Sequence, residues 1–181
     1  GGRLVLGVGV GWSEAEFRAL GHDFHRRGRR LDEAIDLFRV AWRDDPVTFH
    51  GEFTRLDRVR ILPQPGRPVP MWVGGGSPAA ERRAVARGDG FQLIGVTPAE
   101  AAPVVARLRE ARPDEGFTVS LRTGWDPQGM DPRRIADEAA AYAAAGVQHV
   151  VAAPWRTTLE DWLRSMDLLA ELVPGQLRRA V

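Results

Sequence analysis

The fold of this chain is decided by the stretch Pro70-Met71-Trp72-Val73-Gly74-Gly75-Gly76-Ser77-Pro78-Ala79-Ala80-Glu81-Arg82-Arg83-Ala84. A short apolar run ends in three glycines, and Ser77 and Pro78 then stand in the N-cap and first-turn positions of a helix. This order predicts a strand, then a tight turn of glycines without side chains, and then the start of a helix. Glycines let the backbone come close to a ligand, and the free N–H groups of a helix start suit a phosphate-sized anion. The alternative is an ordinary strand-to-helix turn in which the glycines serve geometry alone.

The same strand-then-helix order recurs five times along the chain. Strands are expected at residues 3–8, 71–73, 91–94, 117–122 and 147–152. Helices are expected after Ser13, at 26–43, 78–87 and 98–111, from Pro132 to Gly146, and after a Thr157–Glu160 cap, with a hairpin at 47–56 that turns at Gly51. The strands are short and mainly apolar, without clean in–out alternation. They indicate a parallel sheet covered on both faces, or a βα barrel.

In either architecture, ligands bind at the carboxyl ends of the strands. The candidate residues at those ends are Gly9, Gly11 and Trp12, Gly74 to Ser77, Gly95 to Thr97, Gly124 and Trp125, and Pro154 and Trp155. Bare turns and indole rings that gather at one rim suit a ligand with a phosphate and a flat ring.

A Rossmann dinucleotide site is the obvious competitor, because Gly7-Val8-Gly9-Val10-Gly11 resembles the start of its fingerprint. The pattern G-x-G-x-x-G needs a third glycine where this chain has Trp12 or Glu14, depending on the starting glycine. The acidic residues near the required distance, Asp32 and Glu33, fall inside the expected long helix. The sequence therefore argues against this site.

Composition removes several classes of function. The 181 residues are enough for one domain with a core, and 25 basic residues against 24 acidic ones leave a net charge of +1. With so small a net charge, the protein has no strong electrostatic field that would attract nucleic acid or a membrane surface. The chain has no Cys and no Lys, which excludes thiolate nucleophiles, disulfides and Schiff-base lysines. We expect a cytoplasmic protein with no nucleic-acid or membrane partner, and with no membrane-spanning run.

The sequence also offers little support for a metal site or for a Ser/His/Asp catalytic triad. His22 and His25 stand three residues apart, but no third ligand is placed near them and the cluster Arg26–Arg30 repels a cation. That cluster is expected to be a solvated helix start. No Ser/His/Asp triad can be assembled, and Ser77 is better suited to cap a helix than to act as a nucleophile. No metal site is expected.

Several other residues have structural interpretations. Asp89, between two glycines, is expected to fix a turn, and His50 and His149 to pack or lie on the surface. Trp42 and Trp162 are expected in the core because they lie on apolar helix faces. The last helix offers Leu159, Trp162, Leu163, Met166, and Leu169 or Ala170 for its buried side.

An ordered set of motifs carries a family resemblance. Its first part is Leu4-Val5-Leu6-Gly7-Val8-Gly9-Val10-Gly11-Trp12, Glu16-Phe17, Leu20-Gly21, Asp23-Phe24 and Arg30-Leu31-Asp32-Glu33-Ala34. Its second part is Pro63-Gln64-Pro65, Pro70-Met71-Trp72-Val73-Gly74-Gly75, Gly88-Asp89-Gly90-Phe91 and Val147-Gln148-His149-Val150-Val151. Together they resemble the bacterial-luciferase-like monooxygenase family over nearly the whole chain. The most similar branch is the actinobacterial enzymes that use the deazaflavin coenzyme F420.

The resemblance implies a TIM-type barrel that binds a flavin or deazaflavin at its carboxyl rim. It implies a cofactor site made of Gly9, Gly11 and Trp12, the phosphate-binding residues Gly74, Gly75, Gly76 and Ser77, and Gly95 and Thr97 nearby. The cofactor would be F420, which carries hydride between its ring and a small organic substrate. The alternative is FMN, which would support monooxygenation instead.

The resemblance also implies that this chain is a partial TIM (β/α)8 barrel. Its five βα units match the fourth to eighth of the family, so we expect one domain over residues 1–181, a fragment that lacks the first three units. No catalytic residue can be assigned, and the fragment alone is expected to be inactive. Its unpaired sheet edges predict a homo-oligomer or association with the missing N-terminal half. A non-catalytic half-barrel partner and a sugar-phosphate barrel enzyme remain as alternative functions.

Overall fold

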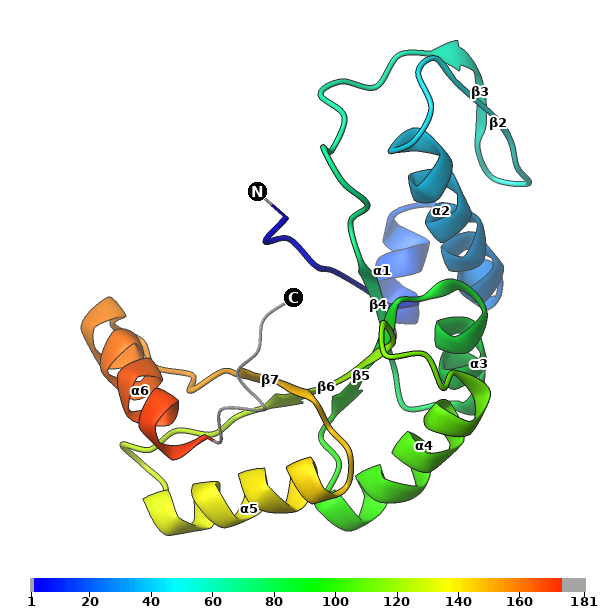
Figure 1. Cartoon of the computed structure of the whole chain (residues 1–181). Coiled ribbons are helices and arrows are strands. Elements are labelled where there is room, and N and C mark those ends of the chain that lie inside the picture. The colour runs from blue at the N-terminus through cyan, green and yellow to red at the C-terminus, as the bar shows by residue number, and fades with distance from the viewer. Residues whose placement is uncertain (1, 174–181) are drawn as a thin grey trace.

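The computed structural model describes residues 2–173, so the ends of the expected domain, residue 1 and residues 174–181, lie outside the described part. One sheet forms the centre of the molecule (Figure 1). Its five parallel strands lie in the order β1 (Leu6–Val8), β4 (Met71–Gly74), β5 (Gly90–Ile94), β6 (Thr118–Thr123) and β7 (His149–Ala152). The expected half-barrel of strand–helix units is confirmed.

The remaining elements follow the expected order. The helices are α1 (Glu14–Ala19), the 3₁₀ turn η1 (Phe24–Arg26), α2 (Arg27–Ala41), α3 (Pro78–Arg87), α4 (Pro98–Ala111), α5 (Pro132–Ala144) and α6 (Leu159–Leu172). The expected hairpin is formed by β2 (Val47–His50) and β3 (Arg55–Val59). Figure 1 shows α3, α4 and α5 along the outer, convex side of the sheet. Strand β1 is shorter than expected, because its partner β4 pairs only from Met71 onward.

The two faces of the sheet differ in chemistry. The face toward the helices carries the buried core residues Met71, Val73, Phe91, Leu93, Val119 and Leu121. The inner face carries the alternate residues, which include Gln92, Ser120 and Arg122. In β6 polar and apolar residues alternate, with Val119 and Leu121 toward the helices, but burial does not alternate because Ser120 between them is buried too. Helices cover only one face, so only one face needs to be apolar.

The Arg26–Arg30 cluster does more than start a solvated helix. Arg26 pairs with Glu52 at the hairpin tip, and Arg29 lies 3.3 Å from the same carboxylate. Glu33 accepts hydrogen bonds from the Phe53 N–H at 2.8 and 3.0 Å. Burial opposes ionisation of Glu33, but these backbone hydrogen bonds outweigh it and lower its pKa. The start of α2 therefore holds the hairpin in place.

Helix α6 departs from its expected packing. Its N-cap is Thr158, whose hydroxyl accepts from the Asp161 N–H, rather than Thr157. Leu159, Leu163 and Met166 are exposed, and the buried residues are Ser165 and Leu169. Within residues 2–173, α6 packs beside α5 at one end of the sheet, so only a narrow stripe of it is covered. Trp42 and Trp162 are likewise half-buried instead of lying in the core.

Candidate functional site

The register of the sheet brings the predicted site segments to one edge. Val8 pairs with Val73, and Gly74 pairs with Gln92, so the carboxyl ends of β1, β4 and β5 are neighbours. A Cβ on Gly9 would lie 3.7 Å from the Gly74 carbonyl oxygen, which puts the loop after β1 directly beside the triglycine turn. The structure therefore places Gly9–Trp12 and Gly74–Ser77 side by side, with Gly95–Thr97 after the next strand.

The triglycine corner, residues Gly74 to Ser77, is open and its backbone is exposed to a ligand. Gly75 has φ +145°, and a Cβ there would lie 2.9 Å from the Ala80 Cβ, so the chain needs glycine at this point. Gly76 is exposed, and a Cβ on it would meet nothing within 4 Å. Within the described range, the N–H groups of Gly76 and Ser77 have no hydrogen-bond acceptor. The corner therefore offers free donors where a helix begins.

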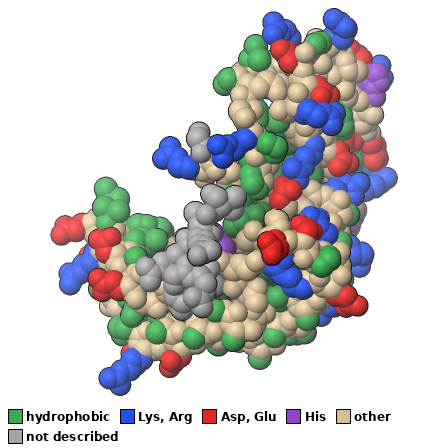
Figure 2. Space-filling view, in the orientation of Figure 1, with side chains coloured by type: hydrophobic (Ala, Val, Ile, Leu, Met, Phe, Trp, Pro, Cys, Tyr) green, Lys and Arg blue, Asp and Glu red, His purple; other side chains and the backbone are tan. Residues whose placement is uncertain are grey.

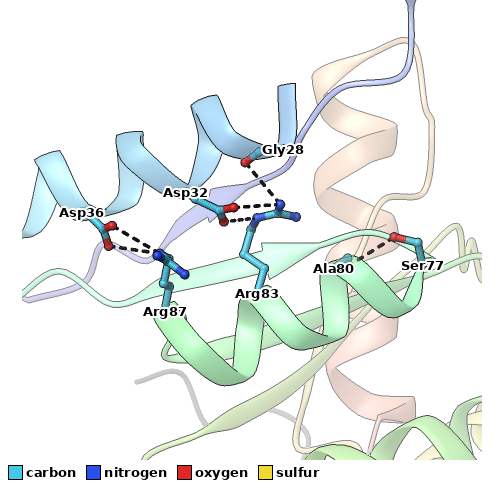
Figure 3. Close-up of polar contacts among 7 residues, drawn as sticks. All are labelled: Gly28, Asp32, Asp36, Ser77, Ala80, Arg83 and Arg87. Carbon is cyan, nitrogen blue, oxygen red and sulfur yellow. Dashed lines mark hydrogen bonds and ion pairs between the residues drawn. The ribbon is translucent and has the colours of Figure 1, made fainter. Parts of the chain in front are cut away.

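Helix α3 is held so that its N-terminus stays at this corner (Figure 3). The Ser77 hydroxyl accepts from the Ala80 N–H at 3.3 Å and fixes the first turn. Arg83 Nε donates to Asp32 Oδ1 at 2.6 Å, and Arg87 Nε lies 3.2 Å from Asp36 Oδ1. Both pairs join α3 to α2, so the long helix sets the direction in which the free N–H groups point.

The second turn, at Gly95 to Thr97, is built differently. Thr97 caps α4, and its N–H and hydroxyl both donate to Glu100 Oε2, at 2.7 and 2.8 Å. Hydrogen bonds from the Thr97 N–H and then its hydroxyl lower the pKa of Glu100, which keeps this carboxylate ionised. The start of α4 already holds a negative charge of its own. An added anion is therefore better accommodated at Gly76 and Ser77 than at Thr97.

The loop after β1 is shaped by Gly11, which has φ +79° and whose Cβ would lie 2.9 Å from the Phe17 ring. Trp12 follows it and is 87% exposed. Its indole is therefore largely free of contacts, and it follows by three residues the glycine, Gly9, that lies beside the triglycine corner.

The inner face of the sheet carries a cavity of about 510 Å³ lined by Trp72, Gln92 and His149 among others. His149 Nδ1 lies 3.0 Å from the Ser120 hydroxyl, and its ring meets the Trp72 ring edge-on with centroids 4.9 Å apart. Figure 2 shows the molecule hollowed on this side, between the part that carries the hairpin and the part that carries α6. The alternation of polar and apolar residues in β6 was the sequence signal that could have revealed the polar side chains on this inner face.

Comparison with known proteins settles the family. A family model described as luciferase-like monooxygenase matches residues 1–145. This chain belongs to the luciferase-like monooxygenase family.

Individual relatives within this family were compared with the chain by sequence. An uncharacterized protein of Mycobacterium tuberculosis is 33% identical over 182 residues, which cover 96% of this chain and 62% of that protein. An F420-dependent glucose-6-phosphate dehydrogenase of Intrasporangium calvum is 35% identical over 134 residues, or 71% of this chain and 39% of that enzyme. The chain thus spans about 62% of the length of the first of these curated relatives.

Solved structures support the fold of the luciferase-like family. The monooxygenase RslO1 from Streptomyces bottropensis aligns with a TM-score of 0.69 and 20% identity over 94% of this chain and 68% of RslO1. At this identity the likeness establishes the architecture alone.

The other two tryptophans expected at the rim, Trp125 and Trp155, differ in exposure in this luciferase-like half-barrel. Trp125 is only 2% exposed, and its Nε1 donates to Glu138 Oε2 at 2.9 Å, so it packs under α5 and does not line a rim pocket. Trp155 is 69% exposed and lies beside the ends of β5 and β6. Asp89 accepts from the Met71 N–H at 2.8 Å and from Arg39 at 2.6 Å, which confirms that it fixes its turn.

Among residues 2–173, no three His, Asp or Glu side chains come close enough together to hold a metal ion. No helix in the same range combines the length and apolarity needed to cross a bilayer.

The burial of His149 gives a testable pH dependence. Loss of hydration lowers the pKa of His149 below its usual value near 6.5. Below that value the unfolded chain takes up the proton more readily than the folded one, so stability is full above about pH 6.5 and is lost as the pH falls. We expect the stability difference between the parent and His149→Asn to stay nearly constant above about pH 7 and to change as the pH falls from 6.5 to 5.5 in urea titrations. A stability difference that does not change as the pH falls below 6.5 would contradict this effect of burial.

Proposed function

We propose that this chain is the cofactor-binding part of an oxidoreductase that transfers hydride between coenzyme F420 and a small organic substrate. The observation that carries the proposal is the open triglycine corner, whose Gly76 and Ser77 N–H groups have no acceptor in the described part of the chain. It lies at the carboxyl edge of a luciferase-like half-barrel, and a relative 35% identical over 134 residues is F420-dependent by name.

Each part of the site has a role in this proposal. The N–H groups of Gly76 and Ser77 donate to the cofactor phosphate, and the start of α3 adds its partial positive charge. Gly9, Gly11 and Trp12 line one side of the bound cofactor, and Gly95 lines the other. When bound, reduced F420 supplies the hydride, and the protein positions both reactants and excludes water.

An FMN-dependent monooxygenase is the second candidate, because the matched family is described as luciferase-like monooxygenase and RslO1 is a monooxygenase. The same corner would hold the FMN phosphate. Absorbance separates the two candidates, since bound deazaflavin absorbs near the violet edge whereas FMN adds a second band in the blue.

Binding and turnover are expected to separate in this chain. The triglycine corner is complete within residues 74–77, but within residues 2–173 β1 and β7 each have a strand on one side only. We propose that the inner face is completed by three further βα units or by a second copy of the chain, and that the isolated chain is inactive.

The test is to equilibrate the purified chain with F420 or with FMN, remove free ligand, and record the absorbance spectrum and the mass of the complex. We expect F420 to be retained without turnover. Retention of FMN alone would favour the monooxygenase, and retention of neither would contradict the role of the corner. Turnover by a strictly monomeric chain would contradict the need for further strands.

A further inference from the structure

A second cavity of about 270 Å³ lies at the carboxyl ends of β5 and β6, next to the turn at Gly95. Its walls come from three connections: Gly95 and Val96 after β5, Gly124 after β6, and Trp155 after β7. Tyr142 of α5 and Arg122 of β6 complete it, and we call it the Arg122 pocket. It lies on the side of Gly95 away from the triglycine corner, because β5 separates β4 from β6.

Among residues 2–173, Arg122 is the only charged side chain that lines this pocket. It lies on the inner face of β6, since its neighbour Leu121 is buried in the core toward the helices. Within residues 2–173, its guanidinium forms no ion pair and no hydrogen bond, and its Cζ lies 5.4 Å from the centroid of the Trp155 ring. The guanidinium is therefore positioned by the indole, and its five N–H donors remain available.

Trp155 is held in an uncommon backbone conformation. Its φ is +53°, a left-handed value that is rare for a bulky residue, and its side chain is still largely exposed. The loop is anchored by the Ala153 N–H, which donates to the Thr123 carbonyl at 2.9 Å. A Cβ on Gly124 would lie at contact distance, 3.5 Å, from the indole Nε1, so the ring packs beside the end of β6. Strained conformations of this kind gather at ligand sites.

The opposite wall is fixed and uncharged. The Tyr142 hydroxyl donates to the Val96 carbonyl oxygen, and burial raises the pKa of Tyr142, so this group stays neutral. The carboxylates nearest to Tyr142 are already engaged, Glu138 by Arg134 and Trp125, and Glu100 by Thr97. The charges of Glu138 and Glu100 act on Tyr142, but neither carboxylate lines the pocket itself, where Arg122 supplies the charge among the described residues.

We propose that the Arg122 pocket binds the carboxylate of a small planar organic substrate. The guanidinium fork matches a carboxylate in two parallel hydrogen bonds, and the flat body of the ligand would lie against the Trp155 indole. This assignment names the substrate class of the proposed oxidoreductase and so rests on that function. It places the substrate anion one strand away from the corner that holds the cofactor phosphate.

The test uses the purified full chain without any cofactor, with benzoate as the probe and benzamide as its neutral match. The indole N–H signals of the six tryptophans are recorded by NMR, and Trp155→Phe identifies the Trp155 signal. We expect benzoate to shift the Trp155 signal with a dissociation constant at least ten-fold below that of benzamide. Arg122→Gln should remove this preference, and Arg164→Gln, at an exposed position on α6, should leave it unchanged.

The outcomes distinguish this pocket from the proposed cofactor site. No shift of the Trp155 signal, or equal benzoate binding by Arg122→Gln, would overturn the proposal. Displacement of benzoate by saturating F420 or FMN would also overturn it, because the pocket would then belong to the cofactor. Gly76→Asp should leave benzoate binding unchanged, so a failure of the cofactor assignment would be visible separately.

Discussion

Gly76→Asp is expected to weaken binding of F420 to the purified chain by about a hundred-fold. A Cβ at Gly76 meets no atom within 4 Å, so the new side chain fits without disturbing the fold. Its carboxylate would share the corner with the cofactor phosphate. Two like charges 4 Å apart repel by about 4 kcal/mol at an effective dielectric constant of 20, and solvent screening leaves roughly 2–3 kcal/mol of that. Fluorescence titration of F420 measures the loss.

Gly76→Asn is the matched control, because asparagine has the same shape as aspartate and no charge. It should bind F420 within a few-fold of the parent. Urea titrations of both variants should give the parent's free energy of unfolding, which separates a local charge effect from misfolding. Equal weakening by asparagine and aspartate, or by neither, would place the phosphate elsewhere.

Leu93→Ala is expected to lower the free energy of unfolding by about 3–5 kcal/mol, whereas Ile94→Ala should cost less than about 1 kcal/mol. The two residues are neighbours in β5 and each substitution removes three carbon atoms. Leu93 is 3% exposed and packs in the core between sheet and helices, whereas Ile94 is 52% exposed on the inner face. Urea unfolding of the isolated chain measures both values.

This comparison also tests whether the inner face is covered in solution. If the chain pairs with a second copy through that face, Ile94→Ala should become costly, and its effect should depend on protein concentration. Similar large losses at both positions in a dilute monomer would contradict a core that lies only on the helix side.

The sequence was sufficient wherever the decisive interactions lie within a few residues. Ser77 and Thr97 cap the helices that they were expected to cap, and each does so by bonding a residue three positions ahead. Gly75 has the positive φ that a tight strand-to-helix turn needs. The order of strands and helices followed from these local signals, and the ordered motifs then identified the family. The last cap was misplaced by one residue, because Thr157 and Thr158 offer the same hydroxyl to the helix start.

The sequence was insufficient wherever the answer depends on what lies across the sheet. Trp125 and Trp155 both follow a strand, but Trp125 is buried in the core and donates to Glu138, whereas Trp155 is exposed and lies beside Arg122. Which side of α6 is exposed depends on how much of that helix is covered by α5. The sequence pattern of α6 alone cannot predict this.

The sequence by itself determined the alternation of strands and helices, the glycine turn at Gly74 to Ser77 and the family of the chain. Each of these depends on short stretches of neighbouring residues. Only the tertiary structure decided that the inner face carries polar side chains such as Gln92 beside apolar ones such as Ile94. It also decided that α2 fixes the direction of α3 through Asp32 and Arg83, and that Arg122 contacts Trp155. These features join residues 29 to 51 positions apart along the chain, and such contacts exist only once the sheet has brought its strands together.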